Sequence, residues 1–279
     1  GKLDEFLPNS KVIHIDIDPA EIGKNVDVDV PIVGDAKNVL SSLVKQLKGF
    51  ESNTDSKQWY DGRISIKNSF LPRVSYDTTP IMPQQVLKEI NSALTSDTIV
   101  TADVGLNQMW AAHFYNTTKP RNFITSGGLG TMGYGFPAAI GAKVAKPENP
   151  VLAIVGDGGF LMVNQELATI KEYDIPVIIA ILNNRKLGMV YQWQNLLFDG
   201  RFSETDMGKN VDFVKLAEGY GIDGKRITEP GESEIAINKA LKDNESIVLD
   251  IVIKKNEFLP MVPPGAAVDD ILGEFKHES

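Results

Sequence analysis

Two polar residues, Asp157 and Asn184, each follow an apolar run and carry oxygen atoms that could ligate a metal ion. The first run covers 151–155 and stops at the glycine-rich turn 156–159, and the second covers 176–182 and stops at an Asn-Asn pair. Runs of this length on either side of a helical pattern predict parallel strands joined by a crossover helix. Ligands bind beyond the carboxyl ends of such strands. An ionised Asp beside an amide oxygen suits Mg²⁺, which takes its remaining ligands from water and phosphate.

The glycines of this turn, Gly156, Gly158 and Gly159, would let the backbone approach an anion closely. Their N–H groups would point at that anion from the start of the next helix. The pattern therefore predicts a site for a metal-bridged diphosphate. Gly-Asp-Gly alone is equally consistent with an ordinary strand-to-helix turn. The Asn-Asn pair behind a second buried strand favours the diphosphate site.

The order Gly-Asp-Gly, 24 residues, Asn-Asn resembles the signature of thiamine-diphosphate enzymes. Within that family, several further segments are similar to the large catalytic subunit of acetolactate synthase: 14–23, 108–112, 125–135 and 188–194. The resemblance covers nearly the whole chain. A full subunit of this kind has three domains, and the resemblance implies that this chain begins inside the middle one.

The resemblance implies an enzyme that decarboxylates pyruvate on thiamine diphosphate and joins the two-carbon unit to pyruvate or 2-ketobutyrate, in valine, leucine and isoleucine biosynthesis. Family members activate the cofactor through a glutamate in the N-terminal domain of a neighbouring subunit. No Glu here, including Glu166, matches that motif, so no catalytic residue is assigned and we expect the isolated chain to be inactive. The alternatives are another pyruvate-using thiamine enzyme (an oxidase or a sulfoacetaldehyde acetyltransferase) or a non-catalytic cofactor-binding and assembly fragment.

Matched residue by residue, the resemblance assigns Mg²⁺ to Asp157, Asn184 and the backbone carbonyl of Lys186. It implies further contacts to thiamine diphosphate from eight residues: Gly105, Leu106, Asn107, Gly130, Met132, Gly158, Gly159 and Met189. The chain departs from the commoner Gly-Gln-His of the family at positions 105–107. Met132 would lie under the cofactor and force its bent shape.

The resemblance also implies a substrate pocket at Met189 and Trp193, in which Trp193 favours the larger 2-keto acid. FAD in the full subunit would be lined by Asp16, Ile17, Gly34, Asp35, Gln108 and Met109. Taken without the resemblance, the residue types favour plainer interpretations for several of these positions. Asn107 is equally suited to cap a helix, Met132 to fill a core, and Met189 with Trp193 to pack on one helix face. The acidic strand end at residue 16 is more typical of a capped turn.

Composition narrows the range of partners. The 279 residues are 42% hydrophobic and 23% charged, with a formal net charge of −9. The acidic balance argues against nucleic acid and anionic membranes as partners, and no apolar run reaches the roughly 18 residues that span a bilayer. The absence of cysteine excludes disulfides and thiolate chemistry and fits a reducing cytoplasm. The resemblance adds a homodimer or tetramer of the full subunit and a possible regulatory small subunit.

Strands alternating with helices predict an α/β fold with a doubly wound parallel sheet over 80–279. A partial α/β flavin-type domain over 1–48 and a linker over 49–79 with a short helix near 56–66 would precede it. The expected strands are 11–17, 98–101, 122–125, 151–155, 176–182, 225–227 and 247–253. The expected helices are 36–47, 83–94, 107–115, 136–144, 213–220 and 232–242. The five glycines of 126–135 predict a loop, because each costs roughly 1 kcal/mol in a helix interior.

Overall fold

The computed structural model describes residues 1–50, 55–69, 72–208 and 211–273. The chain forms two compact units, one made of 1–72 together with 260–279 and the other of 73–259. The domain bounds predicted from the sequence, 1–48, 49–79 and 80–279, stay a prediction.

The larger unit is built on a six-stranded sheet with the order β4-β3-β5-β6-β8-β7. All of its strand pairs are parallel. The strands are β3 (Ile99–Ala102), β4 (Phe123–Thr125), β5 (Val151–Gly156), β6 (Ile178–Asn183), β7 (Asp223–Ile227) and β8 (Ile247–Val252). The helices are α3 (Pro83–Ala93), α4 (Leu106–Phe114), α5 (Gly135–Ala145), α6 (Asp157–Val163), α7 (Leu167–Glu172), α8 (Gly188–Leu197), α9 (Phe213–Gly219) and α10 (Glu232–Asp243).

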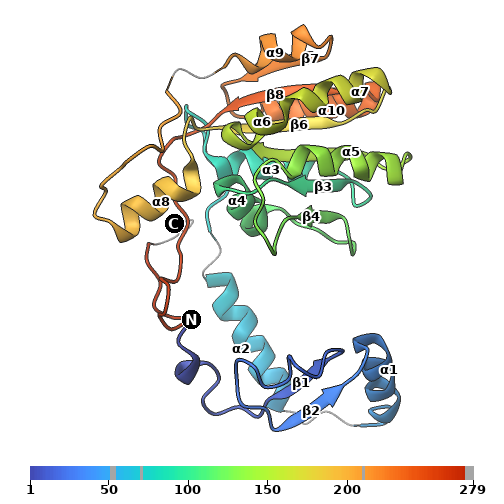
Figure 1. Cartoon of the computed structure of the whole chain (residues 1–279), viewed down its shortest axis with the longest axis vertical. Helices are drawn as coiled ribbons and strands as arrows, with labels where there is room; N and C mark the ends of the chain where they lie inside the picture. The colour runs from blue at the N-terminus through green and yellow to red at the C-terminus, as the bar shows by residue number, and fades with distance from the viewer. Residues whose placement is uncertain (51–54, 70–71, 209–210, 274–279) are drawn as a thin grey trace. The chain divides into compact units, whose positions relative to one another are not determined.

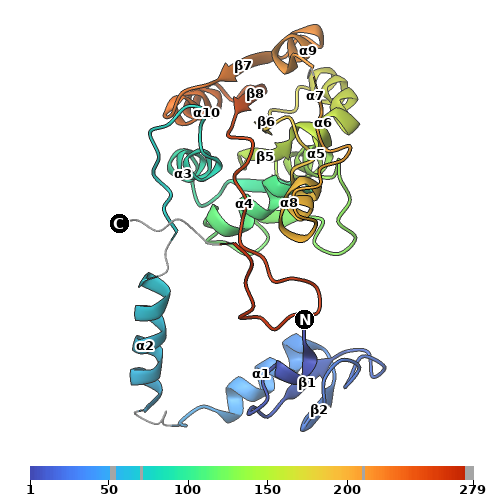
Figure 2. The same ribbon diagram turned by 90° about the vertical axis from the view of Figure 1, so that its left-hand side faces the viewer.

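Helices cover both faces of this sheet (Figures 1 and 2). Helices α3, α4 and α10 lie on one face, and α5, α6, α7 and α9 lie on the other. Because both faces are covered, β6 is buried along its whole length, as the continuous apolar run predicted. The predicted α/β fold with a doubly wound parallel sheet is confirmed.

The core on the α5 side is organised around three aromatic rings that form one tilted pair and one edge-to-face pair. Phe160 of α6 lies 5.7 Å from Phe136 of α5 and 5.7 Å from Phe213 of α9, measured between ring centroids. All three side chains are fully buried against the central strands. Packing of this kind, worth about 3–5 kcal/mol for each Phe truncated to Ala, fixes where α6 begins relative to β5.

The crossover between β5 and β6 differs from the single helix that the sequence predicted. It is interrupted by a 3₁₀ turn, η2 (Asn164–Glu166), between α6 and α7. Val163 leaves the helical region with φ −137°, and the Asn164 side chain donates to the carbonyl of Leu161 at 2.8 Å. Such a local side-chain hydrogen bond competes with the helical ladder. The prediction of one continuous helix is therefore wrong.

The smaller unit contains η1 (Leu3–Glu5), a parallel pair β1 (Ile13–Asp16) and β2 (Val30–Val33), α1 (Ala36–Gln46) and α2 (Asp55–Ser69). Asp35 caps α1, because its Oδ1 accepts from the backbone N–H of Asn38 at 3.0 Å. The short strand β2 was not predicted, since Pro31 weakens a strand pattern. Helix α2 is longer than the predicted 56–66.

Candidate active site

A cleft opens where the carboxyl ends of β3, β5 and β6 meet. It encloses about 500 Å³ when the space open to solvent is counted. The cleft is lined by residues that the sequence analysis singled out: Gly105, Leu106, Asn107, Met132, Asp157, Gly158, Gly159, Asn184, Lys186 and Met189. The structure therefore brings together residues that span more than eighty positions of the sequence.

Asp157 and Asn184 emerge side by side because Gly156 pairs with Leu182 in the parallel ladder. Both side chains are buried, at 1% and 4% exposure. The Oδ1 atom of Asn184 accepts from the backbone N–H of Lys186 at 3.0 Å, which fixes its direction and leaves a second lone pair. A carboxylate beside a fixed amide oxygen is a donor set that suits Mg²⁺.

Lys186 is held by contacts on both its backbone and its side chain. Its Nζ pairs with Asp206 at 2.6 Å and lies 4.7 Å from the ring centre of Tyr191. Hydrogen bonding from Lys186 lowers the pKa of Asp206. Lys186 and Asp206 also form an antiparallel bridge, and Leu187 donates its N–H to the carbonyl of Thr205 at 2.9 Å. The backbone that follows Asn184 is therefore constrained by the segment 205–207, which the sequence analysis did not identify.

Two glycines of the cleft are closely packed against neighbouring side chains. A Cβ on Gly158 would lie 3.0 Å from Leu187, and one on Gly188 would lie 2.9 Å from the Cβ of Leu106. The first N–H groups of a helix have no acceptor within the helix, so those of Gly158 and Gly159 can donate to an anion. The donor set and the glycine cradle thus fit a magnesium diphosphate group.

Asn107 does not cap helix α4, so that interpretation of the residue is wrong. The N-cap is Gly105, whose φ of +144° favours glycine. The Asn107 Nδ2 donates to the backbone carbonyl of Asp103 at 2.8 Å. A Cβ on Gly105 would lie 2.7 Å from Asn107 Oδ1, so this amide packs directly beneath the turn.

Four other predicted residues of this unit are not among those that line the cleft. Gly130 lies in the exposed part of its loop with φ +66°. Trp193 is 41% exposed on α8. Gln108 and Met109 are half-buried on α4, and Gln108 donates to Thr125 Oγ1 at 2.7 Å.

The remaining predicted residues lie in the smaller unit, around the end of β1. Asp16 Oδ1 accepts from the N–H of Asp18 at 2.9 Å, and the Asp16 carbonyl accepts from Gly34 at 2.8 Å. Ile17 is 72% exposed. Together with the Asp35 cap, these contacts form the capped turn that the residue types favoured. The flavin role of these residues stays a prediction.

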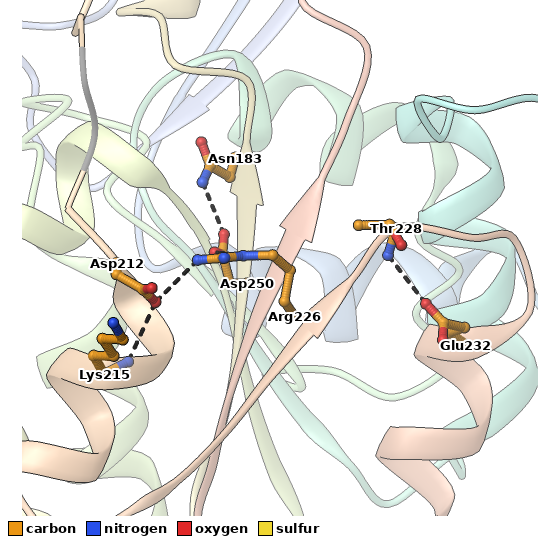
Figure 3. A network of polar contacts seen from close by, with 7 residues as sticks. All are labelled: Asn183, Asp212, Lys215, Arg226, Thr228, Glu232 and Asp250. Atoms are coloured by element: carbon orange, nitrogen blue, oxygen red, sulfur yellow. Dashed lines mark hydrogen bonds and ion pairs between the residues drawn. The ribbon is translucent and has the colours of Figure 1, made fainter.

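The end of β6 is also tied to the far edge of the sheet through a buried carboxylate (Figure 3). Asp250 of β8, 1% exposed, accepts from Asn183 Nδ2 at 2.8 Å and from Arg226 Nε at 3.0 Å. Arg226 also donates to Asp212 at 2.9 Å. Asn183 is thus engaged away from the cleft, and its neighbour Asn184 is the one that lines it.

Three further residues around the cleft were missed by sequence reasoning. Trp110, 1% exposed on α4, lines it. The sulfur of Met207 lies 3.1 Å from a Cβ placed on Gly158. Asp103 is fully buried at the end of β3, and burial raises the pKa of its carboxyl group. Its position directly after a buried strand, like that of Asp157, was the available signal.

The side chains and helices of the described residues narrow the chemistry of the cleft further. Within the part of the chain that the structure describes, no three His, Cys, Asp or Glu side chains gather as a metal cluster. An ion at this cleft would therefore rely on one carboxylate, neutral oxygens and its ligand's phosphates. Across the same described ranges, no helix has the length and apolar character to cross a membrane.

Comparison with known proteins agrees with this geometry. Residues 103–251, over half of the chain, match the family described as "Thiamine pyrophosphate enzyme, C-terminal TPP binding domain". The chain belongs to the thiamine pyrophosphate enzyme family. Residues 1–43 match the central domain of the same family, and the cleft lies within the cofactor-binding match.

Several relatives within the family are acetolactate synthases. The chain is 54% identical to the "Probable acetolactate synthase large subunit" of Methanocaldococcus jannaschii, over all of this chain and 48% of that protein. It is 43% identical to the "Acetolactate synthase large subunit" of Haemophilus influenzae. It is 41% identical to the "Acetolactate synthase isozyme 2 large subunit" of Escherichia coli. Each match covers 98% of this chain and 48% of the relative. The chain thus spans about half the length of these relatives.

Proposed function

We propose that this chain is part of an acetolactate synthase large subunit and that its cleft binds thiamine diphosphate through Mg²⁺. The observation that carries the proposal is the convergence of Asp157, Asn184 and the Gly158–Gly159 turn on one cleft inside the matched cofactor domain. The names of the relatives, at 41–54% identity, support the reaction class.

The proposed division of labour follows from the contacts of the cleft. Asp157, Asn184 and the carbonyl of Lys186 would hold Mg²⁺, and the N–H groups of Gly158 and Gly159 would donate to phosphate oxygens. When bound, thiamine diphosphate supplies the electron sink that lets a 2-keto acid lose carbon dioxide. The protein's part is to orient that group and to exclude water from it, for which the apolar lining is suited.

The apolar part of the lining includes Met132, Leu106 and Met189. Met132 would support the cofactor, and Met189 would contact the substrate. Pyruvate would be the donor, and pyruvate or 2-ketobutyrate the acceptor, with Trp193 favouring the larger acid.

The most direct test is titration calorimetry of thiamine diphosphate into the purified chain, with and without Mg²⁺. Asp157→Ala should abolish the metal-dependent binding, because the variant removes the only carboxylate among the three proposed metal ligands. Asp243→Ala, an exposed carboxylate near the end of α10, is the matched control and should bind like the parent chain. Metal-independent binding, or equal binding by both variants, would refute the proposed site.

The rest of the proposal concerns the complete protein. We propose FAD near Asp16, Ile17, Gly34 and Asp35, supported by the central-domain match over 1–43. The name "large subunit" borne by the relatives supports a regulatory small subunit and an oligomer. We also propose the domain bounds 1–48, 49–79 and 80–279 and a cytoplasmic location. Formation of acetohydroxy acids from pyruvate and 2-ketobutyrate by a full-length subunit tests the activity.

A further inference from the structure

The buried carboxylate of Asp103 accepts hydrogen bonds from backbone N–H groups and has no cationic side chain paired with it among the described residues. It is fully buried, and its Oδ1 accepts from the N–H of Val104 at 2.7 Å and of Gly133 at 2.9 Å. Its Oδ2 lies 3.2 Å from the same Gly133 nitrogen. Across the described ranges no Lys, Arg or His forms an ion pair with it. A carboxylate compensated only by N–H donors depends on those donors staying in place.

Asp103 packs against two glycines that have no room for a side chain. A Cβ on Gly159 would lie 2.3 Å from Asp103 Oδ2, and one on Gly135 would lie 2.6 Å from the Asp103 nitrogen. Gly133 has φ +80°, which favours glycine. The carboxylate is therefore wedged between the loop that ends at Gly133 and the first turn of α6.

Gly133 and Gly159, which pack against Asp103, are each preceded in the sequence by a residue that lines the cleft. Met132 precedes Gly133, and Gly158 precedes Gly159. A Cβ on Gly158 would lie 3.8 Å from Met132 Cε, so these two parts of the lining face each other closely. The distance between Met132 and the turn at Gly158 thus depends on the Asp103 carboxylate, which lies between Gly133 and Gly159.

We propose that Asp103 is a positioning residue: its carboxylate fastens the Gly133 turn against α6 and so sets where Met132 stands in the cleft. This inference rests on the proposed function, because it assigns Met132 to the ring portion of thiamine diphosphate and Asp157 to its diphosphate. It predicts that loss of the Asp103 carboxylate disturbs recognition of the ring and leaves recognition of the diphosphate intact.

Asp103→Asn tests the proposal, since it keeps the volume beside Gly159 but loses the charge and one acceptor facing Gly133. By calorimetry with Mg²⁺, we expect the variant to bind thiamine diphosphate about 10-fold more weakly, the scale of a lost charge-assisted hydrogen bond. Its affinity for inorganic pyrophosphate should stay within about twofold of the parent chain. A general loosening of the fold would weaken both ligands together.

A double-mutant cycle with Met132→Ala asks whether Asp103 acts through Met132. If it does, the double variant binds thiamine diphosphate no more weakly than Met132→Ala alone, whereas independent effects would add. The matched control is Glu89→Gln. Glu89 is also buried and accepts backbone N–H groups, from Gly231 at 2.7 Å and Ser233 at 3.2 Å, but it does not line the cleft. Its loss should leave both affinities unchanged.

The unaltered chain provides a test that does not depend on any variant folding. Hydrogen exchange resolved to single residues should show the Gly133 amide strongly protected, although it lies in a loop, and the Gly128 amide exchanging freely. Rapid exchange at Gly133 overturns the inference, as does a folded Asp103→Asn that binds thiamine diphosphate like the parent, or additive losses in the cycle. Failure of the parent chain itself to bind thiamine diphosphate would instead refute the proposed function.

Discussion

Replacing Gly159 by alanine tests the packing between β3 and α6 with a single methyl group. The new Cβ would lie 2.3 Å from Asp103 Oδ2 and 3.0 Å from Asp103 Cγ. Ordinary contact begins at 3.4 Å, so the gap must open by roughly 1 Å. The carboxylate cannot retreat freely, because Val104 and Gly133 donate to it.

The magnitude combines three terms. Overpacking a close-packed site costs about 1–3 kcal/mol. Moving the carboxylate off Gly133 costs about 1.5–3 kcal/mol, as for hydrogen bonds to charged groups. The higher helix propensity of alanine relative to glycine stabilises α6 by at most about 1 kcal/mol. We therefore expect Gly159→Ala to lower the free energy of unfolding by about 1.5–5 kcal/mol, or the Tm by roughly 3–20 °C for a unit of this size.

Urea and thermal unfolding followed by circular dichroism provide the assay. Gly141→Ala is the matched control, because Gly141 lies inside α5 and a Cβ there has nothing within 4 Å. That variant should be more stable than the parent by about 0.5–1 kcal/mol. If Gly159→Ala falls within about 0.5 kcal/mol of the parent, the close approach of Asp103 and α6 is not the constraint described above.

Two further predictions concern charges on the β7 side. Arg226→Met should lower the free energy of unfolding in urea by about 1–3 kcal/mol. This is less than for a fully buried ion pair, because the Arg226 side chain is 45% exposed. Adding Asp250→Asn should recover part of the loss, and no recovery would mean that the unpaired charge of Asp250 does not cause the destabilisation. Hydrogen bonds from the backbone N–H groups of Thr228 and Glu229 lower the pKa of Glu232. Its stabilisation is thus complete above the unfolded-state pKa near 4.5 and is lost as the pH falls through the lower folded-state pKa. Glu232→Gln should therefore be less stable than the parent at pH 7, and the difference should vanish in acid; a difference independent of pH would contradict this.

Periodicity and strand-end residues were sufficient to predict the sheet and the cleft. The apolar runs 151–155 and 176–182 are typical of buried parallel strands, and parallel strands place their carboxyl ends at one edge. The approach of Asp157 and Asn184 follows from that rule without further information. The same reasoning failed at β2 and at η2, where a proline and a local side-chain hydrogen bond override the periodic pattern.

The residue types of this chain were thus enough to predict the fold class and the meeting of Asp157, Asn184 and the glycine turn at one edge of the sheet. Each of these depends on local propensity and on a period along the chain. The roles of Asp103, Asp250 and Asp206 could be decided only by the tertiary structure. Their partners are Gly133, Arg226 and Lys186, each twenty or more residues away. The sequence shows an Asp in the same way whether its carboxylate is solvated, paired with a cation or buried against backbone N–H groups. Only the folded structure determines which of these surroundings the carboxylate has.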